Sequence, residues 1–143
     1  MRNRFVALGA LLLALVLVST GVLAKSGAMP EKGVWKVTVT PDADATAKGE
    51  KVFDDILTLK SGKFNSTACE PYGFGSISYK MEGAIWMADG TSKTEGKNHW
   101  HGEVDGDHLT GRMTWTKADG TVFNYTFEGH RAGEQTQTGR SRR

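Results

Sequence analysis

The sequence predicts an all-β protein, an antiparallel up-and-down barrel of eight strands, with a two-sheet β-sandwich as the alternative. Short runs rich in β-branched and aromatic residues recur along the chain, separated by turns that contain glycine. No segment after residue 30 shows a sustained helical period. Because a meander of eight strands leaves two unpaired edges unless its first and last strands pair, these observations favour closure into a barrel.

The expected strands alternate apolar and polar residues. In the first, Trp35, Val37 and Val39 share one face, which we expect to point inward. The Asp-Gly pairs at 105–106 and 119–120 favour tight hairpins, since they supply the positive φ angles of such turns. Further turns are expected elsewhere, including one at Asp89-Gly90. The expected strands are 34–40, 52–60, 63–68, 74–81, 84–88, 97–104, 108–117 and 121–129.

The inward faces are expected to be crowded with aromatic rings, which favours a filled core. Asp55 shares the parity of inward residues in its strand, so either a β-bulge resets the register or Asp55 is a buried polar anchor. Glycines of matching parity could leave a gap near one mouth: Gly75, Gly83, Gly102 and Gly111. The other expected inward residues include Phe53, Leu57, Leu59, Phe64, Ile77, Tyr79, Met81, Ile85, Trp100, Val104, Leu109, Met113, Trp115, Phe123, Tyr125 and Phe127.

Residues 1–24 have the pattern of a secretory signal peptide. Arginines near the start precede an apolar run over 5–18, and Val22 and Ala24 stand at the positions that a signal peptidase recognises. The apolar run is shorter than the ~20 residues that span a bilayer as a helix. We therefore expect cleavage after Ala24 and a secreted or periplasmic protein with no stable membrane insertion; an uncleaved N-terminal anchor is the alternative.

The chain has the length of one domain. We expect an N-terminal segment at 25–32, the barrel at 33–131 and a disordered basic tail at 132–143. The 18 Lys and Arg residues nearly balance the 16 Asp and Glu residues, which argues against a dedicated nucleic-acid-binding protein. The single cysteine, Cys69, excludes an internal disulfide framework.

Gly33-Val34-Trp35, at the start of the first expected strand, resembles the Gly-x-Trp opening of the lipocalins and the wider calycin group. In that family the tryptophan closes one end of an eight-stranded barrel, and an arginine late in the chain stacks over it. The resemblance implies this role for Arg131, with Arg112 as the weaker match, and gives Gly33 and Trp35 structural roles. It also implies a pocket for a small apolar molecule. The family's Thr-Asp-Tyr motif and long late helix are absent from this sequence.

Several aromatic residues are candidates for ligand contact. Their rings can stack on a flat molecule or a sugar, while a hydroxyl or an indole N–H offers a polar tip. Packing within the core is the alternative for each of them. The parity of Trp86 is opposite to that of Ile85, which is expected to point inward. The candidates are Tyr72, Tyr79, Trp86, Trp100, Trp115 and Tyr125.

Two histidines, His99 and His101, would lie on one strand face at a spacing that suits Zn²⁺ or Cu²⁺. A third ligand would have to come from Glu103, His108 or His130, and an exposed polar face is the alternative. No cofactor motif and no catalytic constellation is present, and no histidine adjoins Cys69 in the sequence.

We therefore expect a binding protein for a small apolar or aromatic molecule rather than an enzyme. A protein-binding barrel with a filled core is the first alternative, for example an exported inhibitor or an envelope-associated partner protein. Its contacts would lie on the loop at 71–75 and on the open rim. A metal-binding barrel is the second alternative.

Overall fold

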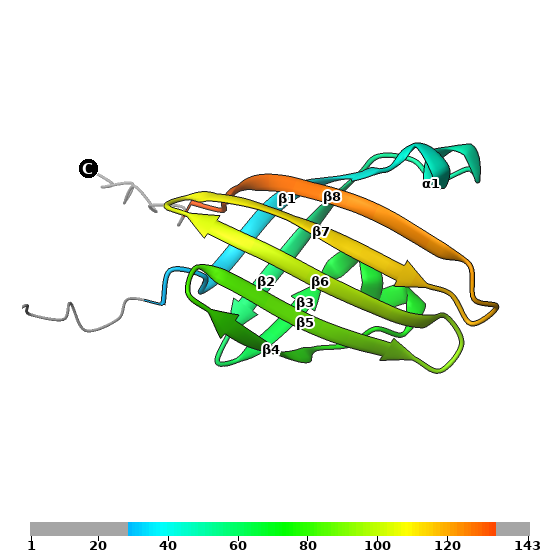
Figure 1. Ribbon diagram of the computed structural model, residues 1–143. Helices are drawn as coiled ribbons and strands as arrows, with labels where there is room; N and C mark the ends of the chain where they lie inside the picture. The colour runs from blue at the N-terminus through cyan, green and yellow to red at the C-terminus, as the bar shows by residue number, and fades with distance from the viewer. Residues whose placement is uncertain (1–28, 134–143) are drawn as a thin grey trace, which may run out of the picture.

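Eight antiparallel strands follow one another in chain order and close into a single barrel, in which the last strand pairs with the first (Figure 1). The computed structural model describes residues 29–133, so the expected signal peptide, the start of the N-terminal segment and nearly all of the tail lie outside the described residues. Because the sheet closes on itself, the predicted up-and-down barrel is confirmed and the alternative two-sheet sandwich is wrong. The strands are β1 (Gly33–Pro41), β2 (Phe53–Lys60), β3 (Lys63–Ser66), β4 (Ile77–Glu82), β5 (Ile85–Ser92), β6 (Gly96–Asp105), β7 (His108–Thr116) and β8 (Val122–Arg131).

Two short helices interrupt the meander. The α-helix α1 (Ala43–Ala47) follows β1, and Asp42 begins it as an N-cap whose carboxylate accepts a hydrogen bond from the backbone N–H of Ala45 at 2.7 Å. The 3-10 helix η1 (Thr67–Tyr72) follows β3, where the sequence analysis placed the end of a strand and a loop. Helices of five and six residues are too short to produce a periodic pattern, so neither element was predicted.

The barrel has two different ends. At one end, left in Figure 1, lie residues 29–32 and the turns β2–β3, β4–β5 and β6–β7; we name it the closed end. At the other, right in Figure 1, lie α1 and the turns β5–β6 and β7–β8; we name it the open end. The helix η1 connects β3 to β4 at the open end, because β3 runs toward that end. Both ends of the described chain lie on the side of the closed end (Figure 1).

The register of β5 differs from the expectation in two respects. Asp89 and Gly90 do not turn the chain, because β5 continues to pair with β6 as far as Ser92. A side chain at Gly90 would meet the Asn98 amide oxygen at 2.2 Å, so this glycine makes room within the sheet. Ile85 was also expected inward, and that assignment is wrong: Trp86 is fully buried and Ile85, which alternates with it, is not.

Large aromatic rings fill the middle of the barrel. Phe64 lies 4.8 Å from Trp86 and 5.0 Å from Trp100, measured between ring centroids, and Phe127 lies 6.1 Å and 5.5 Å from the same two tryptophans. Such tilted pairs add to the stability that burial of their area supplies. The core is therefore filled at this level, as the crowding of inward aromatic residues predicted.

Two glycines that could have left a gap are covered instead. Gly102 of β6 and Gly111 of β7 face one another across the sheet. The ring of Trp86 lies on Gly102 and the ring of Phe127 lies on Gly111, each so close that a β-carbon would meet it at 2.4 Å or less. The prediction of a gap is therefore wrong for Gly102 and Gly111. Because these residues have no side chain, the two aromatic rings lie directly against the backbone of the sheet. Gly75 and Gly83 lie in a loop and a turn.

Asp55 is a buried polar anchor, and β2 pairs with β1 without a bulge. Its carboxylate accepts hydrogen bonds from the Ser66 hydroxyl at 2.5 Å, the Ala68 backbone N–H at 2.9 Å and the Ile56 backbone N–H at 2.7 Å. Burial raises the pKa of this carboxyl group, and the hydrogen bonds oppose that rise. The anchor joins β2 to the start of η1, which forms part of the open end.

Replacing Asp55 by alanine is expected to lower the free energy of unfolding by about 3 kcal/mol, because the buried hydroxyl of Ser66 and the half-buried N–H of Ala68 would lose their acceptor. Asp55→Asn should lower the free energy of unfolding clearly less, because its amide oxygen can still accept hydrogen bonds from the backbone N–H groups of Ile56 and Ala68. Urea unfolding, with tryptophan fluorescence as the signal, measures the free energy of unfolding of both variants. Equal losses in the two variants, or a loss below about 1 kcal/mol for alanine, would contradict the anchoring role.

Candidate functional site

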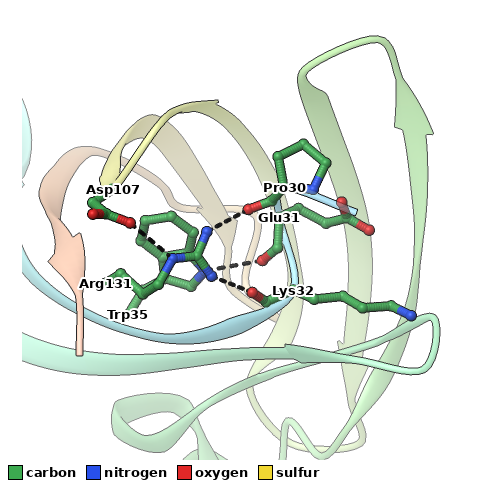
Figure 2. A network of polar contacts seen from close by, with 6 residues as sticks. All are labelled: Pro30, Glu31, Lys32, Trp35, Asp107 and Arg131. Carbon is green, nitrogen blue, oxygen red and sulfur yellow. Dashed lines mark hydrogen bonds and ion pairs between the residues drawn. The ribbon is translucent and has the colours of Figure 1, made fainter. Parts of the chain in front are cut away.

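The closed end is sealed by a side-chain cluster around Trp35. The indole is fully buried, and its Nε1 donates a hydrogen bond to the Glu31 backbone carbonyl at 3.0 Å. The Arg131 guanidinium lies over the indole, 4.2 Å from the ring centroid, in the arrangement that the calycin resemblance implied (Figure 2). Arg112, the weaker match, lies exposed on the barrel exterior.

Arg131 also holds the segment that precedes β1. Its guanidinium donates to the backbone carbonyls of Pro30, at 2.6 Å, and Lys32, and its Nε lies 3.2 Å from the Asp107 carboxylate (Figure 2). Gly33 has a φ of 138°, and a β-carbon there would lie 2.6 Å from the guanidinium. Only glycine tolerates this positive φ and has no β-carbon to collide with the guanidinium. Gly33 therefore allows β1 to begin in close contact with Arg131.

Tyr79 belongs to the closed end. Its hydroxyl donates a hydrogen bond to the buried carboxylate of Glu31 at 3.0 Å. Burial, followed by the effect of Glu31, raises the pKa of Tyr79 to about 12. This candidate ligand contact therefore helps to fasten residues 29–32 against the barrel.

The open end contains a cavity of about 410 Å³. Its lining comes from the segment before β2, from β2 itself, from η1 and the loop after it, from two residues of β7 and from one residue each of β6 and β8. The lining residues are Glu50, Lys51, Val52, Phe53, Asp54, Ala68, Cys69, Tyr72, Phe74, Asn98, Met113, Trp115 and Tyr125.

Five aromatic side chains in this lining form two groups. In one, Trp115 contacts Tyr72 and Phe74 edge-on, with ring centroids 5.4 Å and 6.2 Å apart. In the other, Phe53 and Tyr125 meet edge-on at 6.2 Å. The Trp115 indole is fixed by a hydrogen bond from its Nε1 to the Glu95 carbonyl at 2.7 Å. These contacts hold the aromatic walls in defined positions, as a preformed ligand site requires.

Polar side chains also line the cavity. The Tyr125 hydroxyl donates to Glu50 Oε2 at 2.8 Å, and burial together with this carboxylate raises the pKa of Tyr125 above its usual range. Asn98 is buried, and its Oδ1 has no hydrogen-bond partner among the described residues. Its Nδ2 lies 3.9 Å from the sulfur of Cys69. Burial raises the pKa of the Cys69 thiol, which favours the protonated form over the nucleophilic thiolate.

The structure brings three of the six predicted ligand-contacting residues together: Tyr72, Trp115 and Tyr125 line the cavity. Trp86 and Trp100 are fully buried in the core, and their indole N–H groups have no hydrogen-bond partner within residues 29–133. Neither is part of the cavity lining.

Sequence reasoning missed several residues of the cavity. Phe53 was expected only as a core residue, Phe74 was placed in a strand, and Glu50 and Asn98 were not singled out. Tyr72 and Phe74 lie two residues apart, where an expected loop meets an expected strand, and this proximity was the one available signal. No sequence pattern indicated that the segment containing Glu50 would reach the side chain of Tyr125.

The histidines do not converge. His99 and His101 lie on the barrel exterior, where His99 Nδ1 is 2.6 Å from the Asp89 carboxylate. His108 and His130 pack against each other, with ring centroids 5.0 Å apart, across the β7–β8 pair. Within the part of the chain that the structure describes, no three His, Cys, Asp or Glu residues are grouped as metal ligands.

The fold and the cavity together define a small β-barrel with one sealed end and one open, aromatic-lined end. A scan of protein-family models and searches of curated proteins and of solved structures find no significant match to this chain. Between residues 29 and 133, neither helix has the length and apolar character needed to cross a bilayer.

Proposed function

We propose that this protein is an exported, lipocalin-like barrel that holds one small apolar or aromatic molecule in the open-end cavity. The observation that carries the proposal is the cavity itself. Its volume of about 410 Å³ falls in the range typical of small-molecule sites, and five aromatic side chains line it. Burial of the ligand's apolar surface against these rings would provide most of the affinity.

Two further features support the finer parts of this proposal. The stacking of Arg131 over Trp35 at the closed end agrees with the lipocalin-like assignment. The signal-peptide pattern of residues 1–24 supports export to the periplasm or the exterior.

A protein partner at the open rim is the second candidate function. Tyr72 and Val52 favour it, since 48% and 59% of their surfaces are exposed beside the cavity. Phe74, which would belong to the same contact surface, is buried, and for that reason we place this function second.

Native mass spectrometry of the protein purified from its own cell envelope tests the proposal. We expect a retained small molecule on the unmodified protein and its loss in Ala68→Trp, because an indole at this cavity position would occupy the space. Ala84→Trp is the matched control, since Ala84 is exposed in the turn after β4, and it should retain the molecule.

The other outcomes are equally informative. A bound protein that survives in Ala68→Trp would favour the rim function. A bare chain in all three samples would contradict ligand binding.

A further inference from the structure

The cavity places a carboxylate among aromatic rings. Glu50 is half-buried, and its Oε2 accepts the hydrogen bond from the Tyr125 hydroxyl at 2.8 Å. Neither of the ion pairs formed among residues 29–133, His99–Asp89 and Arg131–Asp107, includes Glu50. A partly desolvated carboxylate without a cationic partner favours a ligand that carries positive charge.

The aromatic walls favour the same kind of ligand. The face of an aromatic ring carries partial negative charge and attracts ammonium groups within about 6 Å of the ring centroid. Tyr72, Phe74 and Trp115 form one wall, and Phe53 and Tyr125 form the other.

Rings at the open end already attract ammonium groups from the chain itself. Lys117 Nζ lies 4.8 Å from the ring centroid of Trp115 and 4.9 Å from that of Phe123. Lys48 Nζ lies 5.5 Å from the Phe123 centroid. Phe123 in turn packs against Trp115 at 6.3 Å, so these rings belong to one aromatic cluster.

The formal charges in the cavity lining are those of Glu50, Lys51 and Asp54. Lys51 and Asp54 are exposed, whereas Glu50 is half-buried. Water screens Lys51 and Asp54 more strongly than Glu50, so among these three lining charges the carboxylate of Glu50 acts most strongly on a bound molecule.

We propose that the ligand of this cavity is an organic cation, an alkyl- or arylammonium compound whose charged group lies against Glu50 and whose hydrocarbon part lies between the two aromatic walls. This inference rests on the proposed function. It narrows the class of expected ligand from small apolar or aromatic molecules in general to those that carry a positive charge. Recognition then combines apolar burial, cation–π attraction and a carboxylate counter-charge.

Three probes of similar size and different charge test the inference. Benzyltrimethylammonium carries a positive charge, neopentylbenzene is its neutral carbon isostere, and benzenesulfonate is an anion. Isothermal titration, together with chemical-shift changes in the cavity residues, gives the affinity and the place of binding. We expect the cation to bind roughly tenfold or more tightly than the neutral isostere, and the anion to bind most weakly.

The outcomes separate the two proposals. Equal or tighter binding of neopentylbenzene or benzenesulfonate in the cavity overturns the cation assignment and leaves the small-molecule function in place. Failure of all three probes to bind contradicts the cation assignment, while the small-molecule function is judged by the mass-spectrometry result.

Glu50→Gln tests the role of the carboxylate directly. The amide oxygen can still accept the Tyr125 hydrogen bond, so the variant removes the charge and keeps the contact. We expect benzyltrimethylammonium to bind roughly tenfold more weakly, with little change for neopentylbenzene. Glu103→Gln, on an exposed position of β6, is the matched control and should bind both as the unmodified protein does. An unchanged affinity of Glu50→Gln for the cation, with an unchanged urea midpoint, overturns the assignment.

Discussion

Replacement of Trp35 by alanine is expected to lower the free energy of unfolding by about 3–5 kcal/mol, the range for removal of a fully buried aromatic side chain. The loss arises from three sources. The barrel would lose the apolar area of the indole, the Glu31 carbonyl would lose its hydrogen bond, and Arg131 would lose the ring on which it stacks. Residues 29–32 would keep their polar contacts with Arg131 and Tyr79.

Equilibrium urea unfolding measures this effect, with far-ultraviolet circular dichroism as the signal because a tryptophan has been removed. Trp35→Phe should lie between the alanine variant and the unmodified protein, since phenylalanine keeps a ring and lacks the N–H donor. Val34→Ala is the control: Val34 is 40% exposed on the opposite face of β1, and its loss should be small. A Trp35→Ala variant within about 1 kcal/mol of the unmodified protein would contradict the sealing role.

Gly102→Val is expected to destabilise the barrel by about 3 kcal/mol or prevent folding, because overpacking a filled core forces side chains and backbone to move. A β-carbon at Gly102 would lie 2.4 Å from the Nε1 and Cε2 atoms of Trp86. That indole cannot shift easily, since Phe64 and Phe127 pack against it. Gly75→Ala is the control: a β-carbon at Gly75 would meet no atom within 4 Å and the φ of Gly75 lies outside the left-handed region, so stability should change by less than about 0.5 kcal/mol.

A double-mutant cycle identifies the cause of the Gly102 effect. Gly102→Ala and Trp86→Leu should each destabilise the protein, and together they should lose less than the sum of the single effects, because the smaller leucine leaves space for the new methyl group. The measurement is again urea unfolding. If the changes in the free energy of unfolding of the two single variants add up to that of the double variant, the Trp86 ring and Gly102 do not constrain one another.

The closed barrel was predictable because its determinants are local. The alternation Trp35, Val37, Val39 specifies which face of β1 is buried, and glycine-containing turns such as Asp105-Gly106 specify antiparallel neighbours. The errors arose where local signals conflicted with pairing. Asp89-Gly90 has the composition of a turn, but β5 gains further ladder hydrogen bonds by continuing to Ser92.

The candidate site was only partly predictable. Tyr72, Trp115 and Tyr125 are separated widely in sequence, and each was a candidate because of its side-chain chemistry alone. Their convergence depends on η1 and on the segment before β2, which together form one side of the cavity. Trp86 and Trp100 have the same chemistry and became core residues, because their strands place them at the middle of the barrel.

The amino-acid sequence by itself determined the all-β class, the meander order and the inward faces of most strands, since hydrophobic alternation and turn residues act over a few neighbouring positions. Only the tertiary structure decided which aromatic residues pack in the core and which line a cavity, and that Glu50 lies among them. The physical reason is that depth along a barrel depends on strand stagger and on how the connecting segments fold over one end. Both result from long-range packing that no local pattern records.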